Sequence, residues 1–162
     1  MSAIYLLDNN VISRMTPIQR SSQFVRERCF ITEDVAHEGR GYAEDLASIR
    51  VIRRSAGMLA HLARIMRLIA PSDTSLVDLY ANKGAADPVL IATALEGMEA
   101  ERDRLFQHKI RVVTEDRAVR RLSTDVGVDV LSLEEFLELG SDPSATTHWM
   151  DHGPWQLVPA RV

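Results

Sequence analysis

Short apolar runs alternate with longer amphipathic segments along the chain. The run Ile4-Tyr5-Leu6-Leu7 is typical of a buried strand, and the turn and cap residues Asp8-Asn9-Asn10 end it. Further strands are predicted over Cys29–Thr32 (or the approach to a helix near residue 33), 110–114 and 128–131. Because helices are predicted between the strands, the pattern favours an α/β fold with a short parallel sheet.

The predicted helices differ in how clearly the sequence marks their ends. Apolar residues at three- and four-residue steps predict one long helix over residues 43–70. Asp87 followed by Pro88 is typical of a helix start, and this helix is expected to run towards Leu105. The segment Ser132-Leu133-Glu134-Glu135 is a capping box that opens a last helix. Shorter helices are expected over 11–15, ended by Pro17, and over 74–82 and 116–124.

The chain changes character near its end. From residue 140 onward the periodicity stops, and both tryptophans, Trp149 and Trp155, lie there. We therefore expect a domain over residues 1–139 and a C-terminal tail over residues 140–162. Its tryptophans are expected to pack on the domain or on a partner.

Composition narrows the class of protein only a little. The chain has 162 residues, enough for one ordinary domain, and its net charge of −4 is not that of a simple DNA-coating protein. The single cysteine, Cys29, cannot form an internal disulfide, so a reducing, cytoplasmic compartment is expected. No apolar run approaches the roughly 20 residues that span a bilayer, so no membrane association is expected.

Four acidic residues are candidates for chemistry. Asp8 and Asp116 each follow a predicted strand, and functional groups gather at the carboxyl ends of parallel strands. Asp87 begins a helix after a loop of small residues, and for all three aspartates helix capping is the alternative explanation. Glu38 is the fourth candidate, and a structural or surface role is its alternative. If such carboxylates converge, a hard cation such as Mg²⁺ or Mn²⁺ would offset their repulsion.

These segments resemble the PIN-domain ribonucleases, and within them the VapC-type toxins of bacterial toxin–antitoxin pairs. The resemblance lies in Ile4-Tyr5-Leu6-Leu7-Asp8-Asn9-Asn10-Val11, then Glu38, Asp87-Pro88 and Val112-Val113-Thr114-Glu115-Asp116, and it covers about residues 3–139. The chain differs from this family in three places. It has Asp8-Asn9 where many such toxins have Asp-Thr or Asp-Ser, a long predicted helix over 43–70, and an added tail.

The resemblance implies a three-layer α/β/α fold with a mainly parallel sheet of about four or five strands. It implies a metal-dependent endoribonuclease whose catalytic, metal-binding pocket for Mg²⁺ or Mn²⁺ is lined by Asp8, Glu38, Asp87 and Asp116. Thr114 would supply a supporting hydroxyl, and Asn9 or Asn10 a supporting amide. Glu33 and Asp34 are alternatives to Glu38 as the second acid of this pocket in chain order. Such toxins commonly form homodimers, and an antitoxin protein neutralises them.

Arginines suggest how an RNA substrate would be held. Arg50 and Arg54 fall on the predicted long helix, and Arg117, Arg120 and Arg121 follow Asp116. Cations beside an acidic pocket can hold a phosphate backbone, although solvated helix faces explain the same residues.

Two other classes of protein remain as alternatives. One is a different Mg²⁺-dependent phosphoryl hydrolase, or a receiver-like phosphoacceptor, since these also place acids after strands. The phosphatase signature has a second Asp where this chain has Asn10. The other is a PIN-like fold that acts as a non-catalytic RNA- or protein-binding module, which the presence of all four acids disfavours.

Overall fold

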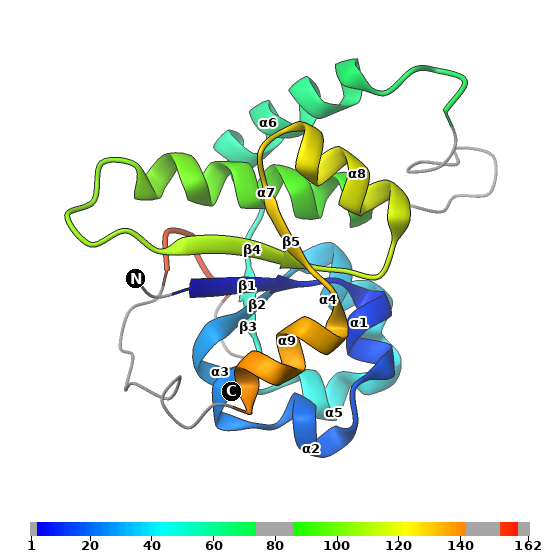
Figure 1. Cartoon of the computed structure of the whole chain (residues 1–162), viewed down its shortest axis with the longest axis vertical. Coiled ribbons are helices and arrows are strands. Elements are labelled where there is room, and N and C mark those ends of the chain that lie inside the picture. Colours follow the sequence, from blue (N-terminus) through cyan, green and yellow to red (C-terminus); the bar gives the residue numbers. More distant parts are fainter. Residues whose placement is uncertain (1–2, 74–85, 142–152, 159–162) are drawn as a thin grey trace.

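Five parallel strands form one sheet in the part of the chain that the structure describes. The computed structural model describes residues 3–73, 86–141 and 153–158, apart from the side chains at positions 42, 43, 45, 86 and 87 (Figure 1). The strands lie in the order β3-β2-β1-β4-β5. Their bounds are β1 Ala3–Leu7, β2 Cys29–Thr32, β3 Arg50–Ile52, β4 Lys109–Val113 and β5 Asp129–Leu131.

The strand order makes β1 and β4 the point where the chain changes direction across the sheet. From β1 the chain moves outward through β2 to β3, and it then returns to the other side of β1 to form β4 and β5. The helices that follow β1 and β4, α1 (Asn9–Arg14) and α8 (Arg117–Asp125), pack on opposite faces of the sheet, and in such sheets ligands usually bind at the carboxyl ends of the strands at this point. Leu7 pairs with Val113, so both strands end at the same level.

Helices cover both faces of the sheet, which confirms the three-layer α/β/α architecture (Figure 1). One face packs against α6 (Ala56–Leu68), α7 (Ala86–Glu101) and α8 (Arg117–Asp125). The other face packs against α1 (Asn9–Arg14), α3 (Gln23–Arg28), α4 (Glu33–Glu38), α5 (Ala43–Leu46) and α9 (Leu133–Gly140). The remaining short helices are α2 (Pro17–Arg20) and η1 (Gly39–Tyr42).

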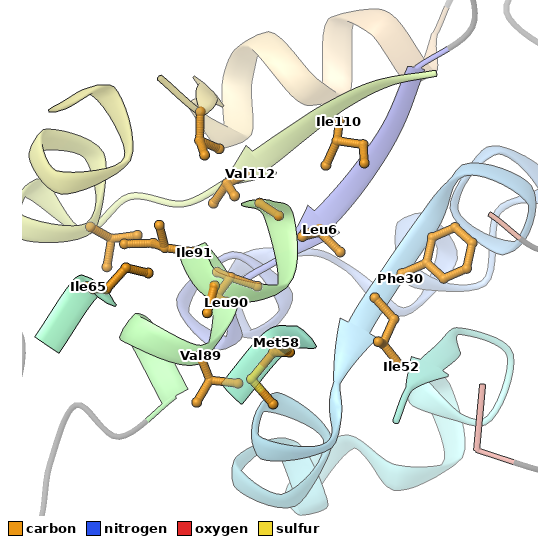
Figure 2. Close-up of a cluster of buried hydrophobic side chains, with 14 of the residues drawn as sticks. Leu6, Phe30, Ile52, Met58, Ile65, Val89, Leu90, Ile91, Ile110 and Val112 are labelled. Atoms are coloured by element: carbon orange, nitrogen blue, oxygen red, sulfur yellow. The ribbon is translucent and has the colours of Figure 1, made fainter. Parts of the chain in front are cut away.

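The helix α7 is the centre of the larger core. Its residues from Val89 to Ala94 are all buried, because the sheet lies on one side of the helix and α6 on the other. Figure 2 shows Leu90 and Ile91 of this helix among the strand side chains Leu6 and Val112. A helix that is apolar all round is expected where two layers cover it.

The prediction of one long helix over residues 43–70 is wrong. The structure divides this range into α5, the edge strand β3 and α6. Ile49 and Ile52 are three positions apart, which resembles helical spacing, but they bury into the cores on opposite faces of the sheet. Pairing of β3 with β2 decides the conformation here, and a strand of three residues is too short to show its own period.

Other boundaries differ from the predictions by a few residues. The helix α7 begins at Ala86, one residue before the predicted cap, and ends at Glu101 instead of running to Leu105. Pro17 follows the end of α1, as predicted, and is itself the first residue of α2, capped by the Thr16 side chain. The predicted helix over 74–82 lies outside the described residues.

The tail residue Trp155 packs into the larger core, as expected. Its Nε1 donates a 3.0 Å hydrogen bond to the Thr93 carbonyl, and its ring lies 5.4 Å from that of Phe30. Leu157 forms an antiparallel bridge with Ile52 at the edge of the sheet. Trp149 lies outside the described residues. Among the described helices, none combines the length and the apolar character needed to cross a membrane.

Candidate functional site

Asp8 and Thr114 lie side by side where β1 and β4 end. The Asp8 amide donates to the Val113 carbonyl at 3.1 Å, which extends the ladder between the two strands by one residue. The Thr114 hydroxyl, fully buried, donates a 2.6 Å hydrogen bond to Oδ2 of Asp8. The parallel register thus brings together two residues that are 106 positions apart.

The Asp8 carboxylate is only 3% exposed. Asn10 Nδ2 donates to Oδ2 at 2.7 Å, and the Asn9 amide donates to Oδ1 at 2.7 Å. Burial raises the pKa of Asp8, and the nearby charge of Asp116 raises it further, while the hydrogen bonds from Thr114, Asn9 and Asn10 lower it. The site therefore holds a carboxylate whose negative charge is poorly solvated, a situation that a bound cation would relieve.

Asp116 serves as the N-cap of α8 and also faces this site. Its Oδ1 accepts hydrogen bonds from the amides of Ala118 and Val119, at 2.7 and 3.1 Å. Its own amide donates to Thr114 Oγ1 at 3.1 Å. Oδ1 accepts both of the hydrogen bonds that cap the helix, and neither of them uses Oδ2. Asp116 can therefore cap α8 and also act in the site.

Glu38, the last residue of α4, interacts electrostatically with the Asp8 carboxylate. Partial burial raises the pKa of Glu38, and the charges of Asp8 and Asp34 raise it further. The two rival acids of the same helix are engaged elsewhere. Glu33 accepts a 3.0 Å hydrogen bond from the Arg54 amide, and Asp34 forms an ion pair with the Arg54 guanidinium. Of the three acids, Glu38 is the one that the fold couples to Asp8.

The position of Asp87 is described only for the backbone. This residue lies in the first turn of α7, and its side chain is outside the described part of the structure. Among the side chains that are described, no three from His, Cys, Asp and Glu gather closely enough to hold a metal ion. The structure thus brings Asp8, Asp116 and Glu38 into one charged neighbourhood without forming a closed set of ligands.

Of the two asparagines expected as supporting residues, Asn10 is the one whose side chain hydrogen bonds to Asp8 and Thr114. Its Nδ2 donates to Asp8 and, at 3.3 Å, to Thr114 Oγ1, and its Oδ1 accepts a 3.2 Å hydrogen bond from the Glu115 amide. The sequence offered two neighbouring asparagines, and only the fold shows which one bridges the ends of β1 and β4. Asn9 Oδ1 is buried and has no hydrogen-bond partner among the described residues.

Glu115 is a connecting residue that sequence reasoning missed. Its Oε1 accepts a 2.7 Å hydrogen bond from the Leu133 amide at the start of α9, and its Oε2 lies 3.9 Å from an Arg14 nitrogen. The only sign of this role in the sequence is that Glu115 stands between the candidate site residues Thr114 and Asp116. Glu115 ties the end of β4 to α1 and α9, and it thereby fixes the backbone that carries Thr114 and Asp116.

Arg50 and Arg54 do not share a helix, which corrects the predicted basic helix face. Arg50 lies on β3, where its guanidinium carbon is 4.0 Å from the centre of the Phe30 ring and its side chain bonds to the Glu27 carbonyl. Arg54 lies between β3 and α6 and pairs with Asp34. Both arginines therefore have structural contacts within the domain.

The arginines of α8 lie closer to the candidate site. Arg120 donates a 3.2 Å hydrogen bond to the carbonyl of Thr114. Arg121 pairs with Asp73 at 3.0 Å, whereas Arg117, in the first turn after Asp116, is exposed. Arg117 is thus the cation of this helix that is best placed to contact a ligand at the carboxyl edge of the sheet.

The oxygen atoms at this edge suit a hard divalent cation. Asp8 and Asp116 provide carboxylates, and Asn9 adds a buried amide oxygen without a hydrogen-bond donor among the described residues. Mg²⁺ and Mn²⁺ favour such all-oxygen surroundings and retain several waters, so a partly open set of ligands is compatible with either ion.

Neither a family model nor a curated protein matches the chain. The functional interpretation therefore depends on the chemistry of these side chains and on the motifs in the sequence.

Proposed function

We propose that the chain is a Mg²⁺- or Mn²⁺-dependent endoribonuclease of the PIN class, the toxin of a toxin–antitoxin pair. The observation that carries the proposal is the buried Asp8 carboxylate, held by Thr114 and Asn10 and repelled by the charge of Asp116. This group lies at the carboxyl ends of β1 and β4, where the strand order reverses and ligands usually bind in such sheets. An acid kept there at an electrostatic cost is typical of a functional site.

Asp8 and Asp116 are the proposed principal ligands, with Glu38 and Asp87 as the further acids that the PIN resemblance implies. A bound cation would neutralise phosphodiester charge and promote ionisation of the attacking water. Thr114 and Asn10 hold Asp8 in a fixed orientation. Glu38, whose pKa is raised by burial and by neighbouring carboxylates, would be the acceptor for the proton of that water.

The proposed substrate is RNA, held through its phosphates. Arg117 and Arg120 extend from α8 beside Asp116, and arginine is well suited to phosphate oxygens. The antitoxin follows from the same resemblance, the cytoplasmic location follows from the single cysteine, and both form part of the proposal. A non-catalytic module would need neither the cation nor the orientation of Asp8.

The test compares Asp8→Asn with the parent protein and with Asp125→Asn, in which an exposed acid at the far end of α8 is changed. Cleavage of a mixed pool of tRNA, rRNA and mRNA is measured with Mn²⁺ and with a chelator, beside Mn²⁺ binding by calorimetry. We expect Asp8→Asn to lose cleavage and most Mn²⁺ binding, and Asp125→Asn to retain both. Cleavage by Asp8→Asn at the parent's rate, or no Mn²⁺-dependent cleavage by the folded parent, would contradict the proposal.

A further inference from the structure

Residues 153–158 lie along the outer edge of β3 and are named here the strap (red in Figure 1). The Arg53 amide donates to the Gln156 carbonyl at 2.8 Å, and the Val158 amide donates to the Val51 carbonyl at 2.9 Å. The strap thus pairs antiparallel with β3, which is an edge strand of the sheet. Its bonds satisfy backbone groups that an uncovered edge would leave facing solvent.

Trp155 anchors the strap in a slot beside Gly97 of α7. The tryptophan is buried, and a Cβ atom at position 97 would lie 2.3 Å from Cζ2 of its ring. The same atom would lie 2.5 Å from Cδ1 of Ile110 on β4. Both distances are far below the roughly 3.5–4.0 Å of a normal carbon contact, so only glycine leaves room for the ring. The indole therefore sets how closely this part of α7 approaches the sheet.

The indole of Trp155 also holds the backbone of α7. Its Nε1 donates a 3.0 Å hydrogen bond to the Thr93 carbonyl, and the Thr93 hydroxyl donates to the Val89 carbonyl at 2.8 Å. Val89 lies two residues after Asp87, in the part of the helix where α7 begins. A continuous series of contacts therefore joins the strap to the end of α7 that carries Asp87.

The strap reaches α4 through the residue that follows Arg53. The Arg54 amide donates a 3.0 Å hydrogen bond to Glu33, and the Arg54 guanidinium pairs with both carboxylate oxygens of Asp34. Glu33 and Asp34 form the first turn of α4, and Glu38 is its last residue. A helix of six residues is too short to be stable alone, so its position depends on contacts of this kind.

We propose that the strap is a positioning element of the cation site, which holds α4 and α7, the helices that carry Glu38 and Asp87, in the arrangement that binds the ion. This inference rests on the proposed function, since it concerns the two outer acids of that site. Asp8 and Asp116 follow the central strands β1 and β4 and depend less on the edge of the sheet. Loss of the strap contacts is therefore expected to weaken cation binding without abolishing it.

Arg54→Gln separates positioning from charge, with Mn²⁺ binding to the full chain measured by calorimetry. The substitution removes a positive charge, which by itself would strengthen the binding of a cation. Loss of the contacts with α4 acts in the opposite direction, and we expect the Kd for Mn²⁺ to rise about fivefold or more. Arg53→Gln is the matched control, because this exposed neighbour makes the same change in charge and bonds to the strap only through its backbone amide. Its Kd is expected to equal the parent's or to fall.

Trp155→Ala tests the contact of the strap with α7 and is also expected to raise the Kd for Mn²⁺ about fivefold or more. Trp155→Phe keeps a ring in the slot and is expected to recover part of the affinity. Phe24→Ala deletes a buried ring from the other core, where it lies against Tyr5 and Phe136. This control is expected to melt at a lower temperature with its Kd unchanged. Each titration is made well below the melting temperature of the variant, so that only folded protein is measured.

Hydrogen exchange of the parent adds a readout that needs no substitution. Linkage between two sites is reciprocal, so Mn²⁺ is expected to slow exchange of the Arg53 and Val158 amides, which bond the strap to β3. An unchanged Kd in folded Arg54→Gln or folded Trp155→Ala, or exchange that Mn²⁺ leaves unaltered, would overturn the role of the strap while the proposed function stands. Where Trp155→Ala does not fold, the Arg54 and Arg53 pair decides. A parent that binds no Mn²⁺ would refute the proposed function and this inference with it.

Discussion

The hydroxyl of Thr114 donates a 2.6 Å hydrogen bond to Oδ2 of Asp8, at the point where two neighbouring strands end. Neither side chain is accessible to bulk solvent to any large extent, since Asp8 is 3% exposed and Thr114 is fully buried. The bond gives the carboxylate a fixed orientation in a poorly solvated place. Substitutions of Thr114 and Asn10, which both donate to this carboxylate, probe its orientation.

Thr114→Val removes the donor to Asp8 while it nearly preserves the shape of the side chain. We expect the free energy of unfolding to fall by about 1–3 kcal/mol, because a buried carboxylate loses a hydrogen bond. We expect RNA cleavage to fall about 10–100-fold, as when groups that orient metal ligands are changed. Urea titration and a single-turnover cleavage assay measure the two effects. Thr114→Ser, which keeps the hydroxyl, should recover most of both; a fully active Thr114→Val would show that this bond does not orient the site.

Asn10→Ala and Asn9→Ala form a matched pair of neighbouring substitutions. Loss of the Asn10 amide leaves the Glu115 amide without its acceptor and removes a donor to Asp8. We expect a loss of about 1–3 kcal/mol in unfolding free energy for Asn10→Ala. The Asn9 side-chain oxygen accepts no hydrogen bond from the described residues, so a smaller loss is expected for Asn9→Ala. Thermal melts with and without Mn²⁺ test this order, and the reverse order would contradict the assigned roles.

Arg117→Gln tests the contact of α8 with the phosphate backbone. Binding is measured in the Asp8→Asn background, so that the RNA stays intact. For a single-stranded RNA we expect the slope of log K against log salt to decrease in magnitude by about 0.7 if one phosphate contact is lost. Arg67→Gln is the control, because this exposed arginine lies near the end of α6. An unchanged slope for Arg117→Gln, or an equal change for Arg67→Gln, would remove Arg117 from the binding surface.

Glu135 makes the capping box of α9 sensitive to acid. The hydrogen bond from the Ser132 amide to this carboxylate lowers the pKa of Glu135, and the Ser132 hydroxyl lowers it further. An acid whose pKa is lower in the folded state stabilises that state above its ordinary pKa of about 4.3. This contribution is lost as the pH falls through the lower, folded value. Glu135→Gln keeps a capping side chain without a titrating group, so its stability should fall less on acidification. Denaturant titrations at about pH 6 and about pH 3 compare the two proteins, and identical losses would refute this assignment.

Local signals were enough to predict several elements of the site. The apolar run before Asp8 and the apolar run before Thr114 predicted strands, and β1 and β4 confirm them. The capping box at Ser132 and Glu135 also forms as predicted. Such signals succeed because they involve neighbours in the chain, and therefore depend little on the rest of the fold.

Contacts distant in sequence explain where prediction from sequence failed. The spacing of apolar residues over 43–70 predicts one helix, yet β3 forms there because β2 offers an edge to pair with. Arg50 and Arg54 consequently lie on β3 and in the loop after it, and not on a shared helix face. In the same way, the sequence could not choose between Asn9 and Asn10, or among the acids of α4. In both cases the choice depends on contacts with residues that are distant in the sequence.

The sequence by itself determined the class of fold and the polar residues that end the two central strands. It did so because apolar periodicity and capping chemistry are local properties of the chain. Only the tertiary structure decided which of those residues meet. The parallel register of β1 and β4 places Asp8 against Thr114, and burial then turns an ordinary cap position into a carboxylate with a raised pKa. Desolvation depends on everything packed around a group, so no stretch of sequence alone can specify it.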